Sequence, residues 1–151
     1  LRGVVVVCVL DKTLDIVSIT AELFSDVRKT KVRRSRFLIR AVPLATTCYG
    51  DAESLVGIAK PLVDEAFETL REPVKWAVSL TRRNSGMQRQ QVVDVFGGLV
   101  PNVHTVSLSE PEMVIVVEAM RGIIGVSVMK AATKVACSDF NLRRLQDEVC
   151  K

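Results

Sequence analysis

The stretch WAVSLTRRNSGMQRQQVVDVF, residues 76–96, predicts a strand, a basic turn and a helix. Trp76, Val78 and Leu80 alternate with smaller or polar residues, which is the period-two pattern of a half-buried strand. Ser85 and Gln88 have the spacing of a capping box, so a helix is expected to begin at Ser85. Its apolar face would consist of Val92, Val95, Phe96 and Leu99.

A cluster of cationic and amide side chains lies at the junction of this strand and helix. Arg82, Arg83 and Asn84 end the strand, and Arg89 lies in the first turn of the helix, away from its apolar face. Helix amino termini and guanidinium groups both suit phosphate oxygens. The junction is therefore a candidate phosphate-binding site.

A second basic run occupies residues 28–36 and contains no acidic residue. One interpretation is a solvated loop, which is what charge runs usually are. The other is a phosphate-contacting loop through Arg33, Arg34 and Arg36, favoured because a second basic cluster exists at residues 82–83. Lys130, which follows the last predicted strand, could reach the same surface as Arg82, although a solvated strand end accounts for it equally well.

Composition bounds the class of protein. The chain has 151 residues, of which 48% are hydrophobic and 5% aromatic, so one domain or two small ones can bury a core of Val, Leu, Ile and Ala. The formal net charge of +4 is a weak argument for nucleic acid when taken alone. No apolar run approaches about 20 residues, so no membrane span is expected. Because the sequence begins at Leu1 rather than Met, a fragment is expected.

Cysteine and histidine spacing gives no sign of a metal site. The four cysteines are far apart, and His104 is the single histidine, so no set has structural-zinc spacing. His104 is expected to be a surface or edge residue, and free thiols in a reducing compartment are expected for Cys8, Cys48, Cys137 and Cys150.

The remaining elements predict an α/β sheet architecture. Strands are expected at 3–10, 37–42, 103–108, 113–118 and 122–129, the last with a close backbone approach at Gly125. A helix capped by Thr13 would bury a face of Ile16, Ile19, Leu23 and Val27. Asp51 would cap a helical segment that Pro61 either divides or kinks. A tail helix at 138–149 would dock through Phe140, Leu142 and Leu145.

Five stretches together resemble the THUMP domain family, in particular its branch of eukaryotic tRNA acetyltransferase adaptors. They match in order and spacing over roughly residues 32–145, with Ser107 where relatives tend to carry Asp, and they comprise 35–48, 78–84, 106–111, 114–118 and 124–128. The resemblance implies an α/β fold with an amino-terminal ferredoxin-like subdomain at 1–47, a THUMP domain at 48–135 and a carboxyl-terminal tail at 136–151.

The resemblance also implies a function. The chain would bind tRNA and present serine and leucine tRNAs to an RNA cytidine acetyltransferase, which makes N(4)-acetylcytidine. It would not be an enzyme and would need no cofactor, and its location would be intracellular, in the nucleus or nucleolus and the cytoplasm. The expected RNA-binding residues are Arg33, Arg34, Arg36, Arg82, Arg83, Asn84, Arg89 and Lys130.

The sequence leaves three alternatives open. The chain could be the RNA-binding fragment of a larger tRNA-modifying enzyme, such as a methyltransferase, a thiouridine synthase or a pseudouridine synthase. It could instead be a docking module for the acetyltransferase, with RNA contacts secondary. The third alternative is a basic α/β domain with no role in RNA binding.

Overall fold

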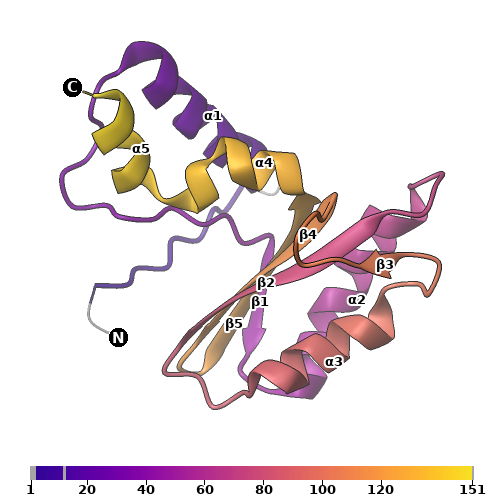
Figure 1. The fold of residues 1–151 in the computed structure, drawn as a ribbon. Coiled ribbons are helices and arrows are strands. Elements are labelled where there is room, and N and C mark those ends of the chain that lie inside the picture. Colours follow the sequence, from indigo (N-terminus) through magenta and orange to yellow (C-terminus); the bar gives the residue numbers. More distant parts are fainter. Residues whose placement is uncertain (1–2, 12, 151) are drawn as a thin grey trace. The chain divides into compact units, whose positions relative to one another are not determined.

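The computed structural model describes residues 3–11 and 13–150, and the chain divides into two compact units (Figure 1). The sheet unit consists of residues 44–130 together with 3–6. The helical unit is built from two separate parts of the chain, residues 7–43 and 131–150.

The sheet unit contains a five-stranded mixed sheet, which confirms the predicted α/β class. Its strands are β1 (Thr46–Tyr49), β2 (Lys75–Arg83), β3 (Thr105–Val106), β4 (Met113–Met120) and β5 (Ile123–Lys130). Their order is β1-β5-β4-β2-β3. β2 runs parallel to β3 and β4, whereas β5 is antiparallel to β4 and β1. The strand predicted at 103–108 is reduced to the two residues of β3.

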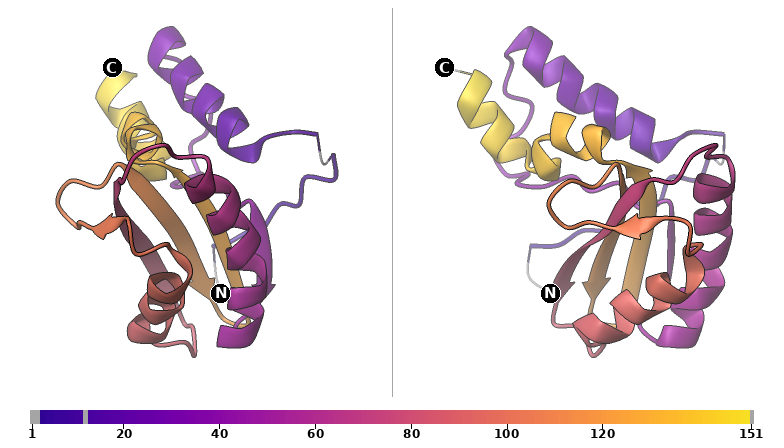
Figure 2. Two further views of the ribbon diagram at one scale, coloured as in Figure 1. Left: turned by 90° about the vertical axis from the view of Figure 1, so that its right-hand side faces the viewer. Right: turned by 45° about the vertical axis from the view of Figure 1, so that its right-hand side comes forward.

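Two helices, α2 (Ala52–Glu68) and α3 (Arg89–Leu99), cover one face of this sheet (Figure 2). Phe67 of α2 meets the buried Trp76 edge to face, with ring centroids 6.4 Å apart. Asp51 caps α2 as predicted, because its carboxylate accepts the Ser54 N–H at 2.8 Å. Pro61 lies inside a single helix, so the alternative of two short helices is wrong.

The start of α3 predicted at Ser85 is wrong. α3 begins at Arg89, and its capping box joins Gln88 to Gln91, whose Oε1 accepts the Gln88 N–H at 2.7 Å. Ser85 instead accepts the N–H of Met87, whose side chain is only 4% exposed. Burial of Met87 places an additional irregular turn between β2 and α3, so the helix begins later in the sequence than predicted.

Gly125 of β5 lies where a side chain would not fit. A Cβ atom added there would overlap the side chain of Leu44. The close approach predicted at Gly125 is therefore confirmed, although the neighbour is a side chain rather than backbone.

The helical unit contains α1 (Ile16–Thr30), α4 (Ala131–Ala136), the short 3-10 helix η1 (Ser138–Phe140) and α5 (Leu142–Val149). Phe24 of α1 meets Phe140 edge to face, with ring centroids 6.4 Å apart. Leu142 and Leu145 are also buried, so the predicted docking of the tail helix is confirmed.

Several predictions for the first 43 residues are wrong. The described residues of 3–10 and 37–42 form irregular chain, apart from an isolated bridge between Arg40 and Asn141. Val5 and Val7 are 83% and 79% exposed. A β-branched run forms a strand only where another strand pairs with its backbone hydrogen-bonding groups. The ferredoxin-like arrangement of this part stays a prediction.

The first helix also differs in detail from its prediction. Asp15, not Thr13, caps α1, and its carboxylate accepts the Val17 N–H at 2.9 Å. Ile19 is 39% exposed, and the buried face consists of Thr20, Phe24 and Val27. Val27 is buried as predicted, whereas Ile19 and Leu23 each lie one position before a buried residue, Thr20 and Phe24.

Candidate nucleic-acid interface

Exposed cationic side chains gather at one end of the sheet. β2 ends with Arg82 and Arg83, which pair in register with Ala119 and Met120 at the end of β4. Arg121 follows directly in the turn between β4 and β5. We call this end the arginine edge; it comprises Arg82, Arg83, Asn84, Arg89 and Arg121, all of them exposed.

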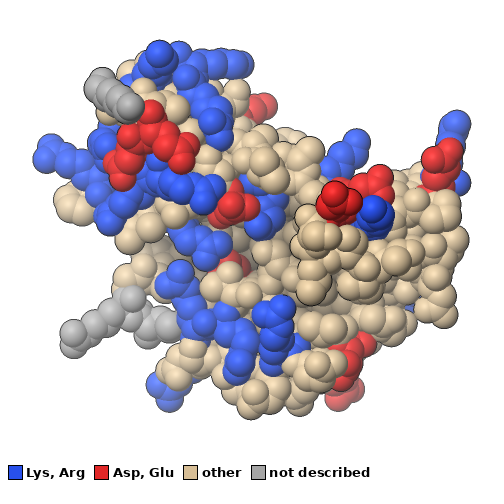
Figure 3. Space-filling model, in the orientation of Figure 1, with Lys and Arg blue, Asp and Glu red and all other residues tan. Residues whose placement is uncertain are grey.

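The cations of the arginine edge are not neutralised within the described part of the chain. None of its arginines has an acidic side chain within ion-pairing distance among residues 3–11 and 13–150. Figure 3 shows the patch of Lys and Arg side chains over the lower left end of the sheet unit. A ligand phosphate would therefore meet guanidinium groups that have no internal partner to give up.

Local backbone structure positions this edge. Asn84 has a left-handed conformation, with φ 53°, which turns the chain sharply after β2. Arg89 is then the first residue of α3, at the positive end of its dipole. Strand end, turn and helix start thus lie in one compact segment, as the sequence predicts.

The ladder across this end of the sheet places an aromatic ring in line with the arginines. Arg83 pairs with Met120, Met120 with Ile123, and Ile123 with Tyr49 of β1. Three strand spacings of about 4.8 Å separate Arg83 from Tyr49, so the row spans about 14 Å. The Tyr49 side chain is 80% exposed.

Arg121 belongs to the arginine edge but is not among the residues that the sequence predicts for this site. It stands alone in its turn, beside Gly122 with φ 77°, and belongs to no basic run. Only the parallel register of β2 and β4 brings it to the end of β2. The sequence does indicate that Arg121 lies in a tight hairpin between two predicted strands. It does not indicate the order of those strands in the sheet, so the neighbours of the hairpin could not be predicted.

The register does not bring Lys130 to the arginine edge. Lys130 pairs with Met113, which pairs with Trp76 at the start of β2. Arg83 pairs with the other end of the eight-residue strand β4. At about 3.3 Å per residue the two positions lie about 23 Å apart along the sheet, so the expectation of a surface shared with Arg82 is not met.

In the helical unit, most arginines of the basic run have internal partners. Arg33 pairs with Asp147 at 2.7 Å, and the Nε of Arg34 donates to Asp26 at 2.9 Å. Arg28 donates to the Ala136 carbonyl at 3.1 Å and to the Ser138 hydroxyl at 2.8 Å. Arg36 is exposed and has no partner among the described residues.

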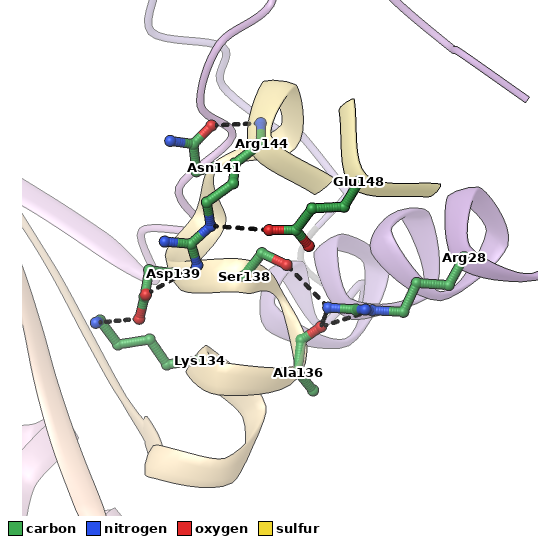
Figure 4. A network of polar contacts seen from close by, with 8 residues as sticks. All are labelled: Arg28, Lys134, Ala136, Ser138, Asp139, Asn141, Arg144 and Glu148. Atoms are coloured by element: carbon green, nitrogen blue, oxygen red, sulfur yellow. Dashed lines mark hydrogen bonds and ion pairs between the residues drawn. The ribbon is translucent and has the colours of Figure 1, made fainter. Parts of the chain in front are cut away.

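A polar network in the same unit engages Lys134 as well (Figure 4). The Asp139 carboxylate accepts Lys134 Nζ at 2.8 Å and Arg144 Nη2 at 3.1 Å. The hydrogen bond from Lys134 is the largest of the effects that lower the pKa of Asp139, and the Arg144 contact adds to it. The network joins α4 to α5 across η1, so these cations stabilise the fold.

Other candidate groups have structural roles. His104 Nδ1 accepts the Val74 N–H at 3.2 Å, and its ring centroid lies 5.1 Å from that of Phe67. Burial raises the pKa of the Cys48 and Cys137 thiols, so neither is an activated thiolate. Within 3–11 and 13–150, no group of His, Cys, Asp or Glu could hold a metal ion. None of the helices described for this chain is long and apolar enough to cross a membrane.

A mixed sheet with two helices on one face, and with arginines at one end that have no acidic partner among the described residues, defines an α/β domain with a cationic edge. The particular family follows from comparison with known proteins. Residues 49–129 match the THUMP domain, and the chain belongs to the THUMP domain family.

Three relatives show how far the similarity extends. THUMP domain-containing protein 1 of Bos taurus is 28% identical over 72% of this chain, and its Drosophila melanogaster homologue is 29% identical over 87%. The Saccharomyces cerevisiae protein named tRNA acetyltransferase TAN1 is 26% identical over 79%. The chain spans 31%, 40% and 44% of the length of these proteins, respectively.

The fold has a counterpart among solved structures. PH1313 from Pyrococcus horikoshii Ot3 superposes with a TM-score of 0.52 at 18% sequence identity. The match covers 67% of this chain and 34% of that protein, and it concerns the fold alone.

Proposed function

We propose that this chain is the tRNA-binding part of a non-catalytic adaptor for tRNA modification. In this proposal it presents serine and leucine tRNAs to an RNA cytidine acetyltransferase for N(4)-acetylcytidine formation. Membership of the THUMP domain family and similarity to a protein named tRNA acetyltransferase support it. The observation that carries it is the arginine edge, with four arginines that have no acidic partner in the described part of the chain.

The proposed mechanism is recognition of RNA by charge and shape. Paired residues on adjacent strands point to the same face and successive residues to opposite faces, so Arg82 and Arg83 project on the two sides of the sheet end. Together with Arg89 and Arg121 they present guanidinium groups on both faces of this end of the sheet, where phosphates of a structured RNA can be contacted. The deep groove of duplex RNA is closed to side chains, so contacts to phosphates and ribose hydroxyls suit a structured RNA.

Binding of full-length serine tRNA across a salt series tests the proposal. Wild type should lose affinity steeply with salt, because each phosphate contact releases a counterion. The variant Arg82→Glu/Arg83→Glu should lose binding while staying folded. Arg71→Glu/Lys75→Glu is the matched control: it changes the charge equally, on the exposed Lys75 at the opposite end of β2 and on the exposed Arg71 four residues before it.

Three outcomes separate the possibilities. Loss of binding in the edge variant alone supports the proposal, whereas equal loss in both variants would mean that only net charge matters. A wild-type protein that does not bind tRNA at low salt contradicts it.

The adaptor role needs a second assay. With purified acetyltransferase, acetyl-coenzyme A, ATP and serine tRNA, the full-length protein should raise the yield of N(4)-acetylcytidine. Without the acetyltransferase it should form none. Product formed by the adaptor alone would make it an enzyme and overturn this part of the proposal.

A further inference from the structure

The most exposed aromatic ring of the described chain lies outside the arginine edge. Phe37 of the helical unit is 91% exposed. It follows Arg36, the arginine of the basic run that has no partner among the described residues. We call residues 34–38 the Phe37 loop.

The Phe37 loop is fixed from beneath by a buried amide. Gln146 of α5 is 0% exposed, and its Oε1 accepts the N–H groups of Arg34 at 2.7 Å and Ser35 at 3.2 Å. Its Nε2 donates to the Ser35 carbonyl at 3.0 Å. A single side chain from the far end of the sequence thus holds three backbone groups of the loop.

The loop is also fixed at its tip and beyond it. The Ser35 hydroxyl accepts the N–H groups of Phe37 at 3.2 Å and Leu38 at 3.0 Å. After the loop, the Ile39 carbonyl accepts the N–H of Arg143 at 3.2 Å. The ring is therefore held out on a preorganised backbone, which lowers the entropic cost of binding.

The charge of the unit indicates what would bind there. Among the described residues, the helical unit contains 10 Lys and Arg against 7 Asp and Glu, whereas the sheet unit contains 8 against 10. The basic surplus of the chain lies in the unit that carries Phe37. A polyanion with flat apolar surfaces fits this combination better than a protein surface does.

We infer that the Phe37 loop is a binding site for an unpaired RNA nucleotide, with the base stacked on Phe37 and the phosphate held by Arg36. Exposed aromatic rings are common stacking platforms for unpaired bases, and guanidinium groups bind the neighbouring phosphates. The inference rests on the proposed function and adds a site for single-stranded RNA to the phosphate contacts at the arginine edge.

Substitutions at Phe37 separate stacking from charge and from apolar docking. Phe37→Leu keeps an apolar side chain and removes the ring, and it should lower the affinity for serine tRNA roughly 5- to 150-fold. The salt dependence should not change, because no charge is removed. Phe37→Trp should bind at least as tightly as wild type. Arg36→Gln should instead flatten the logarithmic salt slope by about 1.

A fluorescence measurement tests the site independently of tRNA binding. In Phe37→Trp the new indole is exposed, whereas Trp76 is 4% exposed and supplies a constant background. An unstructured RNA oligonucleotide of about ten residues should quench the new emission, and a duplex of equal length should not. All variants should keep the wild-type melting temperature, since the Phe37 side chain contributes little to the core.

Each outcome decides between the two proposals. If wild type binds tRNA and Phe37→Leu binds equally well, the stacking site is overturned while the adaptor proposal stands. If wild type does not bind tRNA, the adaptor proposal fails, and absence of quenching by the single strand would overturn the stacking site too. If Phe37→Leu retains and Phe37→Ala loses binding to the acetyltransferase, with RNA binding unchanged in both, the loop docks protein instead.

Discussion

The basic run of the helical unit and the arginine edge of the sheet unit use the same residue type in opposite ways. Arg33 and Arg34 pair with Asp147 and Asp26, so their charges are largely neutralised within the helical unit. The arginine edge has no such acids among the described residues. A guanidinium group keeps its charge free for a ligand only where folding brings no carboxylate to it.

The largest expected effect concerns the support of the basic run. Gln146→Leu removes three part-buried hydrogen bonds to the backbone of residues 34–35, and it should lower the free energy of unfolding by about 2–4 kcal/mol. Chemical denaturation measures the loss. Gln90→Leu is the control, because Gln90 is exposed and its side chain donates to the Asp94 carboxylate at 2.7 Å. If Gln146→Leu and Gln90→Leu had the same free energy of unfolding, the structural role of the basic run would be contradicted.

The next effect concerns the arginine edge. Arg82→Gln/Arg83→Gln should weaken tRNA binding by about 2 kcal/mol, or roughly 30-fold, and flatten the logarithmic salt slope by about 2. The thermal stability should not change, because neither side chain has a partner in the described structure. If this variant lost thermal stability but kept its affinity for tRNA, the arginines of the arginine edge would stabilise the fold instead of binding RNA.

The converse substitution gives a smaller effect. Arg33→Gln/Arg34→Gln should lower the free energy of unfolding by about 1 kcal/mol or less, because both ion pairs are exposed and screened. We expect tRNA affinity within about threefold of wild type, measured at the same salt concentration. A loss as large as that of the Arg82/Arg83 variant would show that RNA breaks these ion pairs and uses the arginines.

The smallest effect is a pH dependence in the polar network of the helical unit. The pKa of Asp139 is lowered in the folded state, so its ionised form adds stability above the unfolded pKa of about 3.9. That stability is lost as the pH falls through the folded pKa. Asp139→Asn should therefore be less stable than wild type at neutral pH, by under about 1 kcal/mol because the carboxylate is half exposed.

Measuring the two unfolding free energies between about pH 7 and pH 3 checks this sign. The difference should shrink below about pH 4. A difference that grows on acidification would mean that the carboxylate is not stabilised in its charged form.

The sequence predicts the strand and helix around residues 76–96 because both patterns are local. The start of α3 was not predictable in the same way, since Ser85 with Gln88 and Gln88 with Gln91 both have capping-box spacing. Burial of Met87 decides between them, and burial depends on the tertiary fold. The strands expected at 3–10 and 37–42 failed for a related reason, because a sequence pattern does not say whether a partner strand exists.

The candidate site was predictable only in part. Arg82, Arg83, Asn84 and Arg89 are close in sequence, so their grouping follows from one strand and one turn. Arg121 joins them, and Lys130 is separated from them, through the register of β2, β4 and β5. The internal pairs of the basic run were equally hidden, since Arg33 and Asp147 are 114 residues apart.

The divided construction of the helical unit has a consequence for synthesis on the ribosome. The sheet unit is almost contiguous, and its last strand ends at Lys130, whereas α1 packs with segments that begin at Ala131. At a synthesis rate of about 5–20 residues per second, these partner segments are made roughly 5–20 s after α1. During that interval the apolar face with Phe24 and Val27 is open to chaperones, so the nascent chain passes through a stage in which the sheet unit can be folded while its first helix is still unprotected.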